Sequence, residues 1–174
     1  MNSILENHFT QLEEDRISLL ASLAVVPEKT LSLSPAKGKW SINQILTHLL
    51  TSEQLTLAYL KKKSLGVDSL KNSGAWELLR MEILKWSQRL PFLKYNAPKH
   101  VVANTPEALP LGELERRWNS IRLELQAFLG TVKDKDLRKL IYKHPVAGRF
   151  DIVQCLIFMR EHCRHHLPQI KRLL

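Results

Sequence analysis

Apolar side chains recur along most of this chain at the three- and four-residue spacing that places them on one face of a helix. The first such stretch predicts a helix over residues 3–24, and the second predicts a helix from Ser41 to about Lys62. The apolar positions of the first are Ile4, Leu5, Leu12, Leu19, Leu20 and Leu23. Those of the second are Ile42, Ile45, Leu46, Leu49, Leu55 and Leu57.

The second half of the chain continues this pattern. Residues 75–90 and 111–130 predict two further helices, and Gly130 is the expected end of the later one. The apolar face of helix 111–130 consists of Leu114, Trp118, Ile121, Leu125 and Phe128. A short helical turn is expected within 133–140, and a last helix is expected to follow Asp151.

Two of these helices begin with a capping signature. Ser41 is followed three residues later by Gln44, so the serine oxygen can accept a free backbone N–H while the glutamine reaches back to the cap. Asp151 and Gln154 form a looser version of the same capping box. Both helix starts are therefore predicted from local chemistry as well as from periodicity.

The remaining segments are connections. Residues 27–39 and 63–74 are expected to be loops, and 144–150 a turn. Four of the eight prolines fall within 91–110, which predicts a long crossing connection. Strand patterns are almost absent. The sequence therefore predicts an all-α fold: one domain over residues 1–174, built as a four-helix bundle with a long crossover connection and an extra short helix.

Composition narrows the class of protein. Hydrophobic residues make up 44% of the 174 residues and charged residues 25%, which is typical of a globular domain. The two cysteines, Cys155 and Cys163, form no disulfide framework or zinc ribbon, so a reducing compartment is expected. No signal peptide and no run of 18 apolar residues is found. We therefore expect a cytoplasmic protein without a membrane partner.

The net charge of +9 permits binding to nucleic acids or anionic surfaces. The basic clusters are short, however: Lys61 to Lys63, and Arg164, Lys171 and Arg172 near the end of the chain. No aromatic-rich RNA motif and no zinc-finger spacing accompanies them. We expect the charge to lie on solvated surface, and nucleic acid is not an expected partner.

The strongest chemical signal is a group of histidines in the last helix. His162 and His166 are four residues apart, so their rings lie on the same face, one helical turn from each other. Core-type residues such as Cys155, Phe158 and Met159 share this face, so both rings are expected to point into the bundle. His165 is expected at the flank.

A third histidine lies on the apolar face of another helix. His48 is surrounded by Leu46, Leu49 and Leu50, where a core helix could equally carry leucine. His48, His162 and His166 could therefore close a site with three nitrogen ligands. The alternative stays open that each is a core histidine with an ordinary hydrogen-bond partner.

Three neutral imidazoles suit zinc, nickel, cobalt or iron, and they leave coordination positions for water or substrate. Such an ion lowers the pKa of its bound water toward about 7. The His-Glu-x-x-His motif is absent, so this helix lacks the general base of zinc proteases. Gln44 and Gln169, each one turn from a histidine, could support the ligands from outside. No catalytic acid or base is identified.

At this point the sequence resembles a known family. The segment KWSINQILTHLLTSE, followed by HPVAGRFDIVQCLIFMREHCRHHLPQIKRLL, is similar to the DinB-like (YfiT-like) superfamily. Its members share a Trp-Ser helix start, a histidine about eight residues later and a terminal His-x-x-x-His before Gln-Ile. These positions are Trp40, Ser41, His48, His162, His166, Gln169 and Ile170 here. The stretch RLPFLKYNAPKHVV also looks like the crossover of that family.

The resemblance implies a four-helix bundle with a three-histidine site for a divalent metal, often in a homodimer. Some relatives are transferases that use a low-molecular-weight thiol such as bacillithiol or mycothiol, and others are regarded as metal-dependent hydrolases. We therefore expect an enzyme acting on a small-molecule substrate, with thiol transfer first and hydrolysis second. The alternative is a non-catalytic helical binding module whose histidines hold a structural metal or belong to the core.

Overall fold

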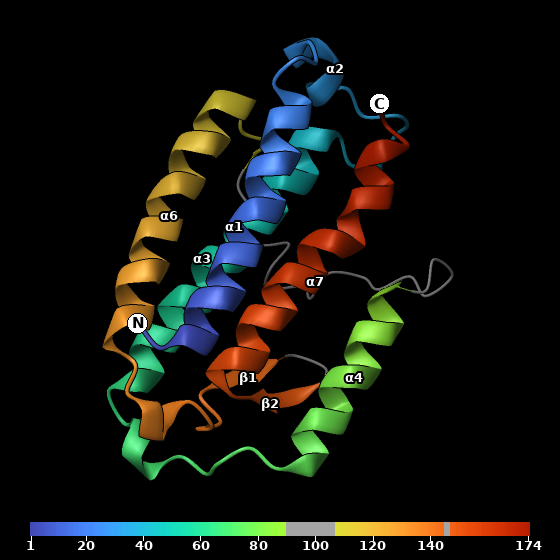
Figure 1. Ribbon diagram of the computed structural model, residues 1–174. Coiled ribbons are helices and arrows are strands. Elements are labelled where there is room, and N and C mark those ends of the chain that lie inside the picture. The colour runs from blue at the N-terminus through green and yellow to red at the C-terminus, as the bar shows by residue number, and fades with distance from the viewer. Residues whose placement is uncertain (90–106, 145–146) are drawn as a thin grey trace.

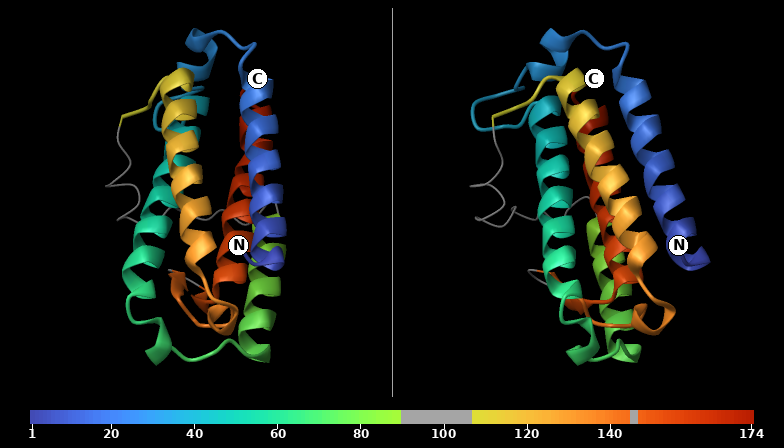
Figure 2. Two further views of the ribbon diagram at one scale, coloured as in Figure 1. Left: turned by 60° about the vertical axis from the view of Figure 1, so that its left-hand side comes forward. Right: turned by 90° about the vertical axis from the view of Figure 1, so that its left-hand side faces the viewer.

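The computed structural model describes residues 1–89, 107–144 and 147–174. Four long helices make up most of it: α1 (Ser3–Leu23), α3 (Ile42–Ser64), α6 (Leu111–Thr131) and α7 (Ile152–Lys171). They run side by side as one bundle, with a shorter helix, α4 (Ala75–Arg89), packed against α7 (Figures 1 and 2). The predicted all-α four-helix bundle is confirmed.

The order of helix directions is unusual for a bundle. α1 and α7 pack together and run the same way, and α3 and α6 pack together and run the opposite way (Figure 1). Because α3 and α6 start at the same end, the chain between them must return along the bundle, and α4 makes part of that return. The long crossover predicted over 91–110 falls largely on residues 90–106, which lie outside the described residues.

Periodicity predicts the core because the apolar stripes of all four helices meet inside the bundle. Trp118 of α6 and Phe150, two residues before α7, are its largest fully buried side chains. Leu5, Leu12, Leu23, Leu31, Ile42, Ile45, Leu46, Leu49, Leu60 and Leu114 are also fully buried. Both cysteines are buried and free, as the absence of a disulfide framework predicts.

Both predicted capping boxes are formed. Ser41 Oγ accepts the Gln44 N–H at 3.2 Å, and Gln44 Oε1 accepts the Ser41 N–H at 2.8 Å. At α7, Asp151 Oδ1 accepts the Gln154 N–H at 2.9 Å, and Gln154 Oε1 accepts the Asp151 N–H at 3.1 Å. A cap of this kind stabilises a helix start by about 1 kcal/mol. These caps fix where the two histidine-bearing helices begin.

The structure differs from the predicted elements in four places. The expected loop over 27–39 contains the short helix α2 (Glu28–Ser32), and Gly130 lies inside α6 and does not end it. A one-turn 3-10 helix occupies Val67–Ser69, within the expected loop 63–74. Another, Asp134–Asp136, agrees with the helical turn expected within 133–140.

The fourth difference is a small sheet. Strand β1 (Tyr142–His144) pairs antiparallel with β2 (Gly148–Phe150), where a simple turn was expected. Three-residue strands are too short to show an alternating pattern, and Gly148 supplies the positive φ of 87° that the hairpin needs. The hairpin lies beside the first turns of α7 (Figure 1).

Candidate metal centre

Three histidines from two antiparallel helices converge inside the bundle. His48 comes from α3, and His162 and His166 come from successive turns of α7. One ring nitrogen from each lies within 4.8 Å of the other two. His165, expected at the flank, is half-buried and outside this group. The structure therefore brings together the three histidines that the sequence singled out.

The ring geometry fits a shared ion. The three ring centroids are 5.1 to 5.3 Å apart, with interplanar angles between 66° and 88°, so the rings are steeply inclined to one another in T-shaped pairs. His48 Nε2 and His162 Nε2 lie 3.3 Å apart. Two nitrogens at about 2.0–2.1 Å from a tetrahedral ion would be about 3.3 Å apart. The pair is thus spaced for an ion between them, and the donor set suits a divalent metal.

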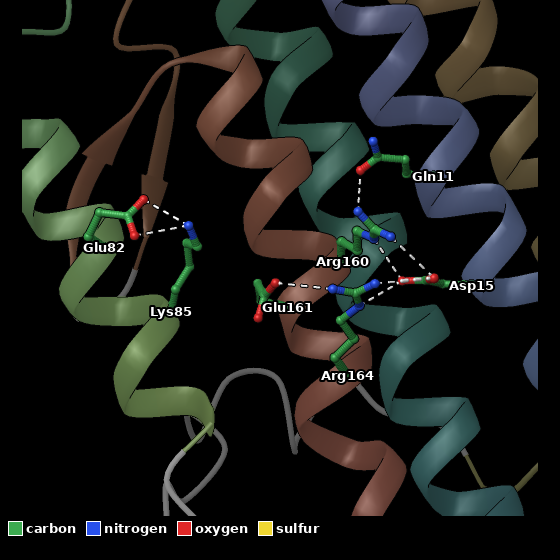
Figure 3. Close-up of polar contacts among 7 residues, drawn as sticks. All are labelled: Gln11, Asp15, Glu82, Lys85, Arg160, Glu161 and Arg164. Carbon is green, nitrogen blue, oxygen red and sulfur yellow. Dashed lines mark hydrogen bonds and ion pairs between the residues drawn. The ribbon is translucent and has the colours of Figure 1, made fainter.

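Packing holds the two helices in this orientation. On α3, Ile45 and Leu49 are fully buried beside His48, so the histidine must face inward too. On α7, Arg160 and Arg164 occupy the face opposite His162, and the Nε of each donates to Asp15 Oδ2 of α1, at 2.7 and 2.8 Å (Figure 3). This double ion pair fixes the rotation of α7 about its axis. The histidine face is thereby directed toward α3.

All three imidazoles are neutral near pH 7. Burial lowers the pKa of His48 to about 4 and that of His166 also to about 4, although a hydrogen bond with Gln169 opposes the shift in His166. Burial, followed by the neighbouring histidines, lowers the pKa of His162 well below 6.5. A neutral imidazole keeps a lone pair, so the cluster needs no proton loss before it binds a cation.

The histidines differ in the hydrogen bonds made by their second ring nitrogens. His166 Nδ1 lies 3.1 Å from Gln169 Oε1. An amide oxygen can only accept, so Nδ1 carries the proton and Nε2 keeps its lone pair. Gln169 thus supports a ligand as expected, whereas Gln44 is engaged in the helix cap. Within the described residues His48 Nδ1 is buried without a hydrogen-bond partner, and the ring lies 5.1 Å from that of Trp40.

These shifts predict how the metal-free protein responds to acid. A histidine whose folded pKa is about 4 and whose unfolded pKa is about 6.5 binds more protons when unfolded between those values. Its contribution to the stability of the fold is complete above about pH 7 and is lost as the pH falls from 6.5 toward 4. The free energy of unfolding should then fall by up to about 1.4 kcal/mol per pH unit for each such histidine.

Urea denaturation of the chelator-treated protein at several pH values measures this slope. His48→Leu replaces the titratable ring with an apolar side chain, and it should give a shallower slope than the parent. Equal stability at pH 7 and pH 4.5 would contradict neutral, buried imidazoles.

Two buried features of the bundle were not found from the sequence. His144 of β1 lies behind Phe158, which stacks on His162. Glu53, one turn and a half beyond His48, forms a buried ion pair with Arg122 of α6. Helical spacing can reveal neither, since each depends on contacts between elements far apart in the chain. A histidine at the start of the predicted turn was the one available signal for His144.

No helix in the described part of the chain is both long enough and apolar enough to cross a membrane.

Comparison with known proteins gives three findings. The family model described as the DinB superfamily matches residues 11–170. The uncharacterized protein YuaE of Bacillus subtilis (strain 168) is 22% identical over 160 residues, covering 92% of this chain and 93% of YuaE. A solved structure of YfiT from Bacillus subtilis, described as a "probable metal-dependent hydrolase with an unusual four-helix bundle topology", is 19% identical. It aligns with a TM-score of 0.58 over 99% of this chain and 87% of that chain. The YfiT likeness supports the fold.

Proposed function

This chain belongs to the DinB superfamily, and from this premise we propose that it is a metal-dependent enzyme acting on a small-molecule substrate. His48, His162 and His166 are its ligands for one divalent transition metal ion: zinc, nickel, cobalt or iron. The observation that carries the proposal is the 3.3 Å separation of two neutral Nε2 atoms from different helices. Without an ion, the two buried imidazoles could form at most one hydrogen bond with each other. That single bond would have to offset the cost of removing two polar rings from water.

The chain's own residues have distinct parts in such a site. The three imidazoles bind, and the Gln169 side chain fixes the tautomer and direction of His166. Three protein ligands leave at least one position for a water, a thiol or a substrate atom, and the bound ion would stabilise its deprotonated form. The apolar neighbours of His48 keep bulk water away from the ligand nitrogens.

Two reactions use that position differently. In the first, a low-molecular-weight thiol would occupy it as the thiolate, the nucleophilic form, and its sulfur would form a bond to an electrophile as the leaving group departs. The resemblance to thiol-dependent transferases favours this reaction. In the second, water is the nucleophile and an ester or amide is cleaved; the description of YfiT as a probable metal-dependent hydrolase favours this one. A non-catalytic binding module remains the alternative from another class.

Activity assays distinguish thiol transfer, hydrolysis and a non-catalytic binding module. Thiol transfer predicts turnover of an electrophile that needs both metal and thiol and persists below the thiol's own pKa of about 8.5. Hydrolysis predicts ester or amide cleavage with water alone, unaffected by added thiol. The measurement is a panel of electrophiles and esters, run with and without thiol and chelator. Activity that survives complete removal of metal would contradict both reactions, and metal-loaded protein inactive across the panel would favour the binding module.

We also propose that the 174 residues form one domain that acts in the cytoplasm as a homodimer. An apolar stripe on α4 supports the dimer: Trp76, Leu79, Ile83 and Trp86 recur at helical spacing and are between 49% and 67% exposed. Stripes of this kind on a surface helix are typical of protein interfaces. Ile83→Lys should convert the dimer to a monomer in light scattering at tens of micromolar, and Leu123→Lys, on the exposed face of α6, is the matched control. A monomeric parent would contradict the dimer.

A further inference from the structure

One end of the bundle carries most of the net charge of the protein. Residues 61–71, the last turn of α3 and the loop after it, contain four lysines and one aspartate. Residues 133–149, between α6 and α7, contain six lysines and arginines and two aspartates. The two segments therefore hold seven of the nine net positive charges. Both lie at the lower end of the molecule in Figures 1 and 2, and we call the surface that they form the basic end.

Backbone contacts join the two segments into one surface. The N–H of Leu140 donates to the carbonyl oxygen of Lys71 at 2.9 Å, and Lys139 Nζ donates to the carbonyl oxygen of Leu70, also at 2.9 Å. Clusters of cations that are short along the chain are thus gathered by the fold. Their fields add at one end of the molecule, because its charges lie close to one another.

Most cations of the basic end have no anionic partner. Lys61 and Lys135 form ion pairs with Glu124 and Asp68, respectively. Five other cations are exposed and form no ion pair with any residue that the structure describes: Lys62, Lys71, Lys133, Lys143 and Arg149. Their charge is therefore available to an anion outside the molecule.

The hairpin places two of these cations opposite each other. Lys143 and Arg149 are partners in the register of β1 and β2, and both side chains are exposed. Like charges that face each other across antiparallel strands destabilise the pairing. Lysines in the last turn of α3 are favoured by the negative end of the helix dipole, but no such effect accounts for the facing pair. An anion held between the two side chains would relieve their repulsion.

An exposed leucine lies among the cations. Leu65, the first residue after α3, is 90% exposed. A bilayer surface suits both features, because lysines contact anionic headgroups while an apolar side chain enters the boundary with the acyl chains. Single-stranded nucleic acids are bound largely by stacking on exposed aromatic rings. Tyr142, the one Phe, Tyr or Trp residue of the two segments, is buried. The side chains of the basic end therefore favour a lipid surface over a nucleic acid.

We propose that the basic end binds peripherally to a membrane surface rich in anionic phospholipids, with Leu65 entering the headgroup layer. Such contact needs no helix that crosses the bilayer. It replaces the expectation from the sequence that the protein has no membrane partner. The inference does not depend on the metal centre, since α7 begins at the basic end and His162 follows about three turns later.

Sedimentation with lipid vesicles tests the basic end. The parent should bind vesicles of phosphatidylglycerol and phosphatidylcholine, bind pure phosphatidylcholine far less, and be released by added salt. Lys143→Gln combined with Arg149→Gln should lower the affinity about tenfold or more, because each cation near an anionic bilayer contributes to binding. The control is Lys37→Gln combined with Lys39→Gln. It removes the same charge from exposed positions before α3, at the opposite end of that helix, and should bind like the parent.

The leucine and the facing charges have tests of their own. Leu65→Asn should lower the affinity about threefold or more, through loss of an apolar side chain from the interface. Val25→Asn, which changes a residue that is 86% exposed just after α1, should not. The double Lys143 and Arg149 variant should be at least as stable to urea as the parent, because it loses a repulsion.

Four results would overturn the inference. They are parental vesicle binding by the double Lys143 and Arg149 variant, an equal loss in the Lys37 and Lys39 control, equal binding of the parent to uncharged vesicles, and a double hairpin variant less stable than the parent. Tighter binding of the parent to a DNA fragment than to anionic vesicles at the same salt concentration would also overturn it, and would assign the basic end to nucleic acids.

Discussion

Replacing His162 with alanine is expected to lower the affinity for a divalent metal by about two to three orders of magnitude. Loss of an outer contact to a ligand already costs about 10- to 100-fold, and loss of a ligand itself removes a direct bond to the ion. The ring of each histidine contacts both of the others, at 5.1 to 5.3 Å, so all three are equally placed to bind the ion. Competition with a chelator of known affinity measures the change, and His48→Ala and His166→Ala should behave alike.

The matched control lies three residues along the same helix. His165→Ala removes an imidazole from α7 that is not part of the cluster, so its metal affinity should equal that of the parent. All variants should be folded by circular dichroism, since each loses only one side chain. Metal held as tightly by the three single variants as by the parent would contradict the ligand assignment.

Replacing Glu53 with alanine is expected to destabilise the fold by about 3–5 kcal/mol, the usual cost of leaving a buried charge without its partner. Glu53 Oε1 accepts from Arg122 Nη2 at 2.7 Å, and the two side chains are only 4% and 3% exposed. Glu53 Oε2 accepts the indole N–H of Trp118, also at 2.7 Å. Burial raises the pKa of Glu53, and Arg122 opposes that shift. Alanine would leave the indole N–H without its acceptor, and the guanidinium would keep only the longer ion pair with Glu13, at 3.2 Å.

Urea denaturation gives the free energy of unfolding for this comparison. The control is Asp68→Ala, which removes an ion pair between Asp68 and Lys135 at the same 2.7 Å but on the surface, where solvent screens it. That variant should be as stable as the parent. If Glu53→Ala does not fold, Glu53→Gln keeps the acceptor for Trp118 and should still be clearly destabilised. A Glu53 variant as stable as Asp68→Ala would contradict the buried pair.

Local chemistry predicted the elements whose signals are local. The capping boxes at Ser41 and Asp151 and the apolar stripes gave the starts of α3 and α7 correctly, because each depends on residues within one or two turns. Short elements were missed for the same reason: the five residues of α2 and the three-residue strands hold too few positions for a period. Gly130 failed as an end signal because a glycine costs a helix only about 1 kcal/mol.

The candidate site also has features that local spacing predicts and features that depend on contacts between distant elements. His162 and His166 could be paired by their spacing, and His48 could be placed inward by its apolar neighbours. Their convergence, however, depends on α3 and α7 packing against each other. The spacing of residues within one helix does not predict which helices pack together. Glu53 and Arg122 are paired across 69 residues, and His144 reaches Phe158 through a hairpin. Such contacts are products of the fold, so the sequence could not predict them.

The central claim is that three imidazoles of this chain hold one ion. X-ray absorption of the protein loaded with one equivalent of zinc tests it most directly, because the spectrum counts the imidazoles and gives their distance. The account predicts three imidazole nitrogens at about 2.0–2.1 Å, together with at least one further oxygen or nitrogen ligand. Zinc that stays free in solution, or that is bound by fewer than three imidazoles, would contradict it.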